Sequence, residues 1–423
     1  MQLARKYIQH FDAEVTEPNR RAIAGRTFRC ELFAGATGGI LEAGFSTFVI
    51  LLAIRAHGAN EYEKAILAGS MSAGLLVAPL GLSLMRATRC SVNWIACALM
   101  VFTGACLLVV FATESLVAYV AGLAFAQIAI AQQYTLRIHV HASNYPAAER
   151  GRRLSWIFIV LGLSCMASSY GFGWFLDHWW KDRSWIFGIM ALAAILCAFA
   201  LALIPVGRLP DDSSTGLHAS LRLIRGDKLF AMILLGWMLL GLGWLTTLPL
   251  RIEYLGSEEG LDLTNSEIAL LTLVIPSLAK ILSLRLFGGF FDRSSFVPFR
   301  IALNFFLIAS VLLFFHAENI YTLCLASVFT GIAFGGSSIA WSLWVTRVAP
   351  PGKEAAYMSA HVALTGVRGM VAPFLGYYLL TQVGFRLTAW ISAGFLVLST
   401  ACFLMIRKHH RLTSIESPKV PSS

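Results

Sequence analysis

Twelve apolar runs, each long enough to cross a bilayer, constrain this chain more than any other feature of its sequence. About 20 consecutive apolar residues span the hydrocarbon core as a helix, and a helix bonds its own backbone polar groups where water is absent. The sequence therefore predicts an all-α integral membrane protein with twelve transmembrane helices. The runs lie near residues 30–54, 63–84, 93–112, 116–138, 154–176, 184–204, 229–250, 267–288, 300–317, 321–345, 357–381 and 385–406.

The composition supports a membrane protein and excludes several other classes. Hydrophobic residues make up 57% of the chain and charged residues 13%, whereas soluble globular chains carry about 25% charged residues. The net charge of +10 comes from cations in short segments between the apolar runs, which is typical of membrane topology and not of a nucleic-acid-binding face. The cysteines include no C-x-x-C pair, so neither a disulfide framework nor a metal site is expected.

The distribution of Lys and Arg predicts which ends of the runs face the cytoplasm, because cytoplasmic loops are enriched in these residues. Segments expected inside carry most of them, including Arg150, Arg208 and Arg300. Residues 1–29 lack the apolar core of a secretory signal. We therefore expect both termini in the cytoplasm and a location in a bacterial inner membrane. Segments expected outside hold few cations, chiefly Arg55, Lys64, Lys181, Arg183, Arg251 and Arg386.

A polar connection divides the chain into two sets of six runs. It covers residues 206–228 and reads "VGRLPDDSSTGLHASLRLIRGDK". We predict a cytoplasmic amino-terminal segment (1–29), two pseudo-symmetric six-helix bundles (30–205 and 229–406) joined by this cytoplasmic linker, and a cytoplasmic tail (407–423).

Two similar segments occur in the predicted bundles. "GLAFAQIAIA" begins at Gly122 in the fourth run, and "GIAFGGSSIA" begins at Gly331 in the tenth. Each is followed by an arginine and then by a P-x-x-E sequence. The shared order of features favours a duplicated architecture, and this alignment pairs Gln132 with Trp341.

Two six-helix halves joined by a polar linker resemble the major facilitator superfamily of secondary transporters, over essentially the whole chain. The best local match is the family's loop motif G-x-x-x-D-R, which occurs in "GGFFDRSSFVPFR". The first-half copy, "GLSLMRATR", has Met85 in place of the aspartate, which weakens the match there. The resemblance implies a cytoplasmic gate made by Gly81, Arg86, Gly288, Asp292 and Arg293.

The resemblance also implies that the first, fourth, seventh and tenth helices line a central cavity. Polar and aromatic side chains gather on these helices. Amides and hydroxyls hydrogen-bond a solute and tryptophan rings stack on flat solutes, although aromatic stripes commonly serve packing alone. The predicted substrate-binding residues on these helices are Gln127, Gln132, Trp237, Trp244, Ser337 and Trp341.

Arg368 lies in the middle of the eleventh run, within "ALTGVRGMVAPF". A charge facing lipid at that depth would cost at least ~3 kcal/mol, so we predict that Arg368 faces the cavity and binds substrate. Glu42, at comparable depth in the first run, is the candidate partner and proton carrier, and His361 is a second proton-coupling candidate because imidazole titrates near neutrality. The charge of Arg368 could be compensated by Glu42 directly, by Glu42 through water, or by a bound anion. The alternative is a permanent pair of Glu42 and Arg368 that only fixes helix packing.

These residues and the resemblance predict a secondary active transporter that moves a small polar or anionic organic solute by alternating access, driven by a proton or sodium gradient. The alternatives are a neutral sugar-like solute, efflux of amphiphiles or drugs, and a non-transporting sensor or accessory subunit. The sequence contains no nucleotide-binding loop and no catalytic constellation, so we expect neither an enzyme nor a cofactor. The expected partners are the solute and membrane lipids, and we expect a monomer.

Overall fold

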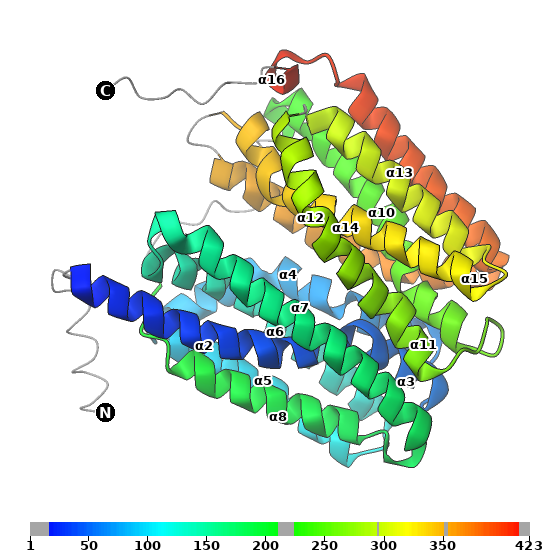
Figure 1. The fold of residues 1–423 in the computed structure, drawn as a ribbon, viewed down its shortest axis with the longest axis horizontal. Coiled ribbons are helices and arrows are strands. Elements are labelled where there is room, and N and C mark those ends of the chain that lie inside the picture. Colours follow the sequence, from blue (N-terminus) through cyan, green and yellow to red (C-terminus); the bar gives the residue numbers. More distant parts are fainter. Residues whose placement is uncertain (1–16, 210–223, 294–295, 351–353, 414–423) are drawn as a thin grey trace. The chain divides into compact units, whose positions relative to one another are not determined.

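The computed structural model describes residues 17–209, 224–293, 296–350 and 354–413, and most of them lie in helices (Figure 1). Apolar composition and the need to bond every backbone amide favour helices throughout. The first half of the chain contains α2 (Glu17–Ala43), a π-helical turn (Gly44–Phe48), α3 (Val49–Arg55), α4 (Glu61–Ala87), α5 (Val92–Ala112), α6 (Leu116–Asn144), α7 (Ala147–His178) and α8 (Trp185–Ala202).

The second half follows the same plan. It contains α10 (Lys228–Gly256), α11 (Asn265–Ala269), a π-helical turn (Leu270–Val274), α12 (Ile275–Arg293), α13 (Phe296–Phe315), α14 (Ile320–Val348), α15 (Glu354–Met405) and α16 (His410–Thr413). Most helices extend beyond the apolar runs by several residues, because composition marks the apolar core of a helix and not its ends.

Eleven helices among the described residues are long and apolar enough to cross a membrane. The longest covers Tyr357–Met405, which is 49 residues. A straight helix of that length would measure about 74 Å, more than twice the thickness of the hydrocarbon core. It is divided at Gly384, whose φ of 73° and ψ of 177° are not helical and which only glycine adopts readily. With this division, the helices agree with the predicted all-α fold of twelve spans.

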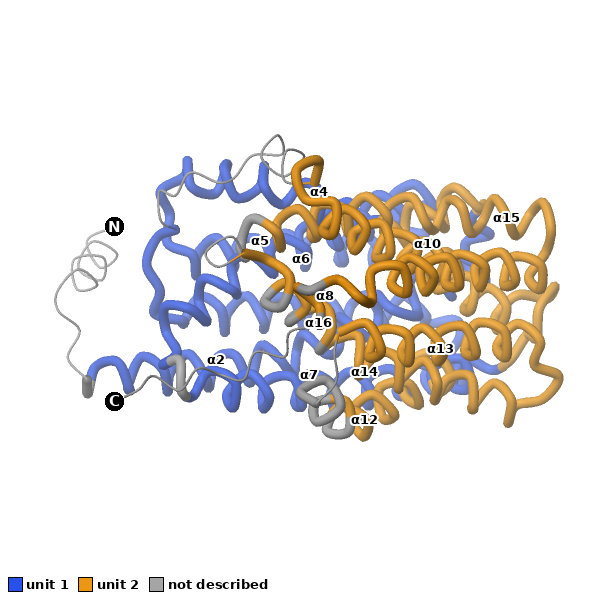
Figure 2. The backbone as a smooth tube through the Cα atoms, turned by 90° about the horizontal axis from the view of Figure 1, so that it is seen from above, with its two compact units in different colours: residues 1–59, 70–213, 264–269 blue, residues 60–69, 214–263, 270–423 orange. Residues whose placement is uncertain are grey.

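The chain forms two compact units (Figure 2). Unit 1 comprises residues 1–59, 70–213 and 264–269, and unit 2 comprises residues 60–69, 214–263 and 270–423. Two short segments are thus grouped with the opposite half of the sequence. Residues 60–69 include the start of α4, whose remainder belongs to unit 1, and residues 264–269 include the whole of α11.

Glycines set the closest helix contacts inside each unit, because the absence of a side chain lets two backbones approach. In unit 1, a Cβ on Gly39 of α2 would lie 2.7 Å from the backbone nitrogen of Cys165 in α7. In unit 2, a Cβ on Gly243 of α10 would lie 2.6 Å from the carbonyl oxygen of Ser392 in α15. A Cβ on Gly376 of α15 would lie even closer to the carbonyl oxygen of Thr246 in α10.

The packing also corrects the alignment of the two similar segments. Gly122 of α6 packs against α5, where a Cβ would lie 2.8 Å from Val110. Gly331 of α14 packs instead against α12, where a Cβ would lie 2.6 Å from the Cβ of Ala279. The two glycines therefore face different neighbours, and the pairing of Gln132 with Trp341 is not supported. Small residues recur at the helical period, so apolar segments can align in a shifted register.

The glycine contacts predict a measurable difference between two positions on α15. Gly376→Ala places a methyl group against the Thr246 carbonyl, whereas a Cβ on Gly394 would have nothing within 4 Å. We expect Gly376→Ala to destabilise the protein by about 1–3 kcal/mol, the usual cost of overpacking, and Gly394→Ala to leave it unchanged. Thermal unfolding of the purified variants in detergent measures this, and equal melting temperatures would contradict the packing.

Candidate functional site

Arg368 is buried inside unit 2, with 6% of its surface exposed. Its guanidinium donates from Nη1 to the carbonyl of Trp237 in α10 and lies 5.9 Å from the centre of the Trp237 ring. Gly241, one turn further along α10, leaves the space that the arginine side chain fills. The Nε of Arg368 has no hydrogen-bond partner among the described residues.

Arg300 is the second guanidinium on the same ring, and it is fully buried. It lies one turn inside α13, 5.1 Å from the centre of the Trp237 ring. Its Nε donates to Oδ1 of Asn304 at 3.0 Å, and its Nη1 donates to Oγ of Ser337 in α14 at 3.4 Å. Its Nη2 has no partner among the residues that the structure describes.

Aromatic rings surround these two charges. His361 of α15 is 1% exposed and its ring centre lies 5.1 Å from that of Trp237, 5.2 Å from that of Trp344 and 5.9 Å from that of Trp341. The ring nitrogens Nε1 of Trp237, Nε1 of Trp344 and Nε2 of His361 also lack hydrogen-bond partners in the described part of the chain. We call Trp237, Arg300, Trp344, His361 and Arg368 the arginine cluster.

Among the described residues, the arginine cluster has no acidic partner. None of the ion pairs between described residues includes Arg300 or Arg368. A buried charge without a partner is costly, and a guanidinium matches the geometry of a carboxylate or phosphate. The cluster is therefore suited to an anion.

The other predicted binding residues fall in three places. Ser337 belongs to unit 2 and accepts from Arg300, and Trp341 contacts His361 while 36% of its surface stays exposed. Trp244 is 5% exposed and packs against Phe334 and under Arg251, away from the partners of the arginine cluster. Gln127 and Gln132 belong to unit 1.

Gln132 makes a helix-packing contact. It is 6% exposed, and its Nε2 donates to the carbonyl of Gly74 in α4 at 2.8 Å. Gly81, predicted as part of the gate, provides the space for the Gln132 amide. A role of Gln132 in solute binding stays a prediction, as does that of Gln127, which is 4% exposed in the same helix.

The predicted proton carriers differ in exposure. Glu42 is exposed and lies just before the π-helical turn Gly44–Phe48, whereas His361 is buried in the arginine cluster. Glu42 belongs to unit 1 and Arg368 to unit 2. Their pairing therefore stays a prediction.

The predicted cytoplasmic gate is described only in part. Met85 is 9% exposed, so it packs inside the protein where the family motif has an aspartate, and Arg86 is partly exposed near the end of α4. Gly288, Asp292 and Arg293 lie on the last turns of α12, but their side chains are outside the described part of the structure. Gating by these residues stays a prediction.

Unit 2 contains a buried ion pair that the sequence did not predict. Lys64 of α4 donates from Nζ to Oε1 of Glu253 in α10 at 2.9 Å, and their side chains are 8% and 10% exposed. The ammonium also lies 5.1 Å from the ring centre of Tyr377 in α15. The pair fastens the start of α4 to the second half of the sequence.

Arg251 and Arg300 were both expected in loops, and the structure places both inside helices. Arg251 is 4% exposed and donates to Oγ1 of Thr330 at 2.6 Å and to Oγ of Ser310 at 2.9 Å. These hydroxyl groups belong to α13 and α14, which lie far from Arg251 in the sequence. Asn304, four residues after Arg300, was the one local signal for a buried arginine.

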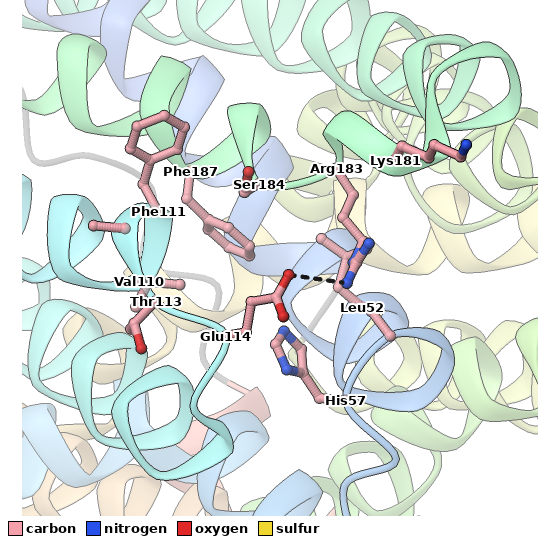
Figure 3. Close-up of a pocket in the computed structure, with 12 residues that line it drawn as sticks. Leu52, His57, Val110, Phe111, Thr113, Glu114, Lys181, Arg183, Ser184 and Phe187 are labelled. Atoms are coloured by element: carbon pink, nitrogen blue, oxygen red, sulfur yellow. Dashed lines mark ion pairs between the residues drawn. The ribbon is translucent and has the colours of Figure 1, made fainter.

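Unit 1 contains a cavity of about 250 Å³ between the end of α3, the end of α5 and the start of α8 (Figure 3). Glu114 points toward Arg183 and His57 in this cavity (Figure 3), and Nη2 of Arg183 lies 4.0 Å from Oε1 of Glu114. Burial, and then the nearby Arg183, lower the pKa of His57 below its ordinary value. The described residues that line the cavity include none of the predicted site residues.

The cytoplasmic end of unit 1, as predicted from the sequence, holds a second buried carboxylate. Glu31 of α2 is 4% exposed; it lies 2.6 Å from Nε2 of His141 and accepts from the Tyr145 hydroxyl. His141 is thus paired with a carboxylate, and no group of three metal-ligating side chains occurs among the described residues.

The fold and its charged cluster define a polytopic helical membrane protein, and the sequence comparison gives its family. The family model of the Major Facilitator Superfamily matches residues 32–317 and 258–423. The chain therefore belongs to the Major Facilitator Superfamily, as the resemblance predicted, and it is a transporter and not an enzyme. No curated protein sequence matches the chain.

Solved structures with the same fold include transporters of different solutes. The nucleoside transporter NupG aligns with a TM-score of 0.71 and 13% identity, over 92% of this chain and 99% of that one. The D-xylose-proton symporter gives 0.65 and 14%, over 89% and 96%. The human organic anion transporter MFSD10 (TETRAN) gives 0.60 and 15%, over 92% and 100%. At these identities the likeness establishes the fold alone.

The buried ion pair predicts non-additive stability. Removing one partner of such a pair typically costs 3–5 kcal/mol, whereas replacing both by apolar residues is often neutral. We expect Lys64→Met and Glu253→Met each to lower the melting temperature and the double variant to regain most of the loss. Thermal unfolding in detergent tests this. The control is Glu149→Gln, which breaks the more exposed ion pair between Glu149 and Arg153 and is expected to cost little. A double variant as unstable as the sum of the single ones would contradict it.

The lowered pKa of His57 predicts a pH dependence of stability. Because the folded state binds the His57 proton less readily than the unfolded state, stability falls as the pH drops through the ordinary histidine value of about 6.5. We expect His57→Gln to reduce the fall in melting temperature between pH 7 and pH 5. An equal fall in the variant and the wild type would show that His57 is not responsible.

Proposed function

We propose that this transporter moves a small organic anion and that Arg368 binds its negative group. The observation that carries the proposal is the arginine cluster, whose two buried guanidiniums have no ion pair among the described residues. A bound anion would compensate this charge and accept from the unpartnered Nε of Arg368. Trp237 and Trp341 would then contact the rest of the solute.

A neutral solute is the second candidate, because tryptophan rings also stack on sugars. It leaves the positive charge of the cluster uncompensated, which disfavours it. Related folds carry nucleosides, xylose and organic anions according to their names, so the fold accommodates either class, and the choice rests on the charge of the site.

The energy source belongs to the same proposal. We propose that a proton gradient drives transport without a cofactor, that the exposed Glu42 takes up the proton, and that His361 responds to it inside the cluster. Support for this comes from the exposure of Glu42 and from the contacts of His361 with Trp237 and Trp344. The transporter would act as a monomer surrounded by lipid in a bacterial inner membrane, with both termini in the cytoplasm.

Counterflow and gradient-driven uptake in proteoliposomes test the proposal with a panel of carboxylates, phosphates, sugars and nucleosides. We expect anion counterflow to fall at least about tenfold in Arg368→Ala, and only partly in Arg368→Lys, which keeps the charge but loses the guanidinium geometry. Glu42→Gln is expected to retain counterflow and lose accumulation against a gradient.

Arg386→Ala is the matched control, because Arg386 lies on α15 but is exposed; we expect it to transport like the wild type. Melting temperatures identify variants that fail to fold. Transport of a neutral solute at an unchanged rate in Arg368→Ala would refute the proposal.

A further inference from the structure

Two guanidinium groups of unit 2 lie near the same aromatic ring. The guanidinium carbons of Arg300 and Arg368 lie 5.1 Å and 5.9 Å from the centre of the Trp237 ring. The two charges are thus at most about 11 Å apart, so a solute that carries two negative charges beside Arg368 would interact with both of them.

The charge of the cluster is +2, and nothing described nearby offsets it. Asn304, Ser337 and the carbonyl of Trp237 satisfy some of the N–H groups with neutral oxygens, which bond the guanidiniums but do not cancel their charge. Arg251 is also buried and also has neutral partners, the hydroxyls of Ser310 and Thr330, but it lies against Trp244 and Phe314 and not against the Trp237 ring. A monoanion would leave one positive charge uncompensated in the helix bundle, and a dianion would leave none.

Each guanidinium keeps an unused donor. Asn304 and Ser337 engage Nε and Nη1 of Arg300 and leave its Nη2 free, while the Trp237 carbonyl engages Nη1 of Arg368 and leaves its Nε free. Arg300 is fully covered by protein, so it acts through its charge. Coulomb interactions persist over several Å in a low-dielectric interior, and direct contact with the solute is not required.

We propose that the solute is a dianion, a dicarboxylate or a phosphate monoester, and that Arg300 is the residue that selects dianions over monoanions. This rests on the proposed function, since Arg368 binds one of the two negative groups. Asn304 is a positioning residue that holds the Arg300 side chain through its Nε.

Paired ligands that differ by one charge test the proposal on the purified full-length chain. Succinate is compared with butyrate, and methyl phosphate with dimethyl phosphate, by calorimetric titration and by inhibition of counterflow. The wild type is expected to prefer the dianion of at least one pair more than tenfold; the pair that shows the preference identifies the dicarboxylate or the phosphate class. We expect Arg300→Gln to reduce this ratio at least tenfold and Arg300→Lys, which keeps the charge, to retain it.

The ratio of dianion to monoanion affinity distinguishes a selective role of Arg300 from a structural one. A variant with a destabilised site would bind both ligands of a pair more weakly by the same factor. If Arg300→Gln does not fold and the phosphate pair shows the preference, the pH dependence of binding to the wild type tests the inference instead. Its affinity for methyl phosphate is expected to fall as the pH drops below about 6, where the second phosphate ionisation is lost. Dimethyl phosphate carries one charge throughout and therefore controls for titration of His361 in the cluster.

Two results would overturn the inference: an unchanged ratio in Arg300→Gln, or equal binding of both ligands in each pair. If the phosphate pair shows the preference, pH-independent binding of methyl phosphate would overturn it as well. Each of these leaves the anion transporter intact if Arg368→Ala still abolishes counterflow of a monoanion. Transport of neutral solutes alone would remove the proposed function itself.

Discussion

Compensation of buried positive charge is the constraint on which the second unit depends. Lys64 obtains a carboxylate from Glu253, and Arg251 obtains two hydroxyls and two aromatic faces. Arg300 and Arg368 obtain only an amide, a hydroxyl, a carbonyl and the Trp237 ring. Of these sites, only the first is a pair of opposite charges. Arg251, Arg300 and Arg368 have neutral partners among the described residues, and Arg300 and Arg368 differ from Arg251 in sharing one aromatic ring.

Close helix packing makes this arrangement possible. Gly243 and Gly376 bring the backbones of α10 and α15 together, and Gly241 leaves room for the Arg368 side chain. This packing brings Arg368 and His361 to Trp237. Aromatic rings surround the buried guanidiniums, and a buried charge interacts more strongly with an anion than it would at the surface. The apolar packing and the polar site therefore have one structural basis.

Family membership and substrate choice rest on different parts of the molecule. The arrangement of helices defines the superfamily, and the same arrangement serves proteins named for nucleosides, xylose and organic anions. Solute specificity lies in side chains carried by that scaffold. For this chain we propose that the paired arginines around Trp237 set that specificity.

The sequence by itself determined the helical membrane fold, the family and the oddity of Arg368, because hydropathy, helix length and a charge within an apolar run are local properties. Tertiary structure alone decided that Arg300 joins Arg368, that Lys64 pairs with Glu253, that Gln132 binds the backbone of α4 and that the segments near Gly122 and Gly331 face different helices. Those outcomes depend on partners that are distant in the chain. They also depend on helices that extend past their apolar runs, so that arginines expected in loops, such as Arg300, lie inside the protein.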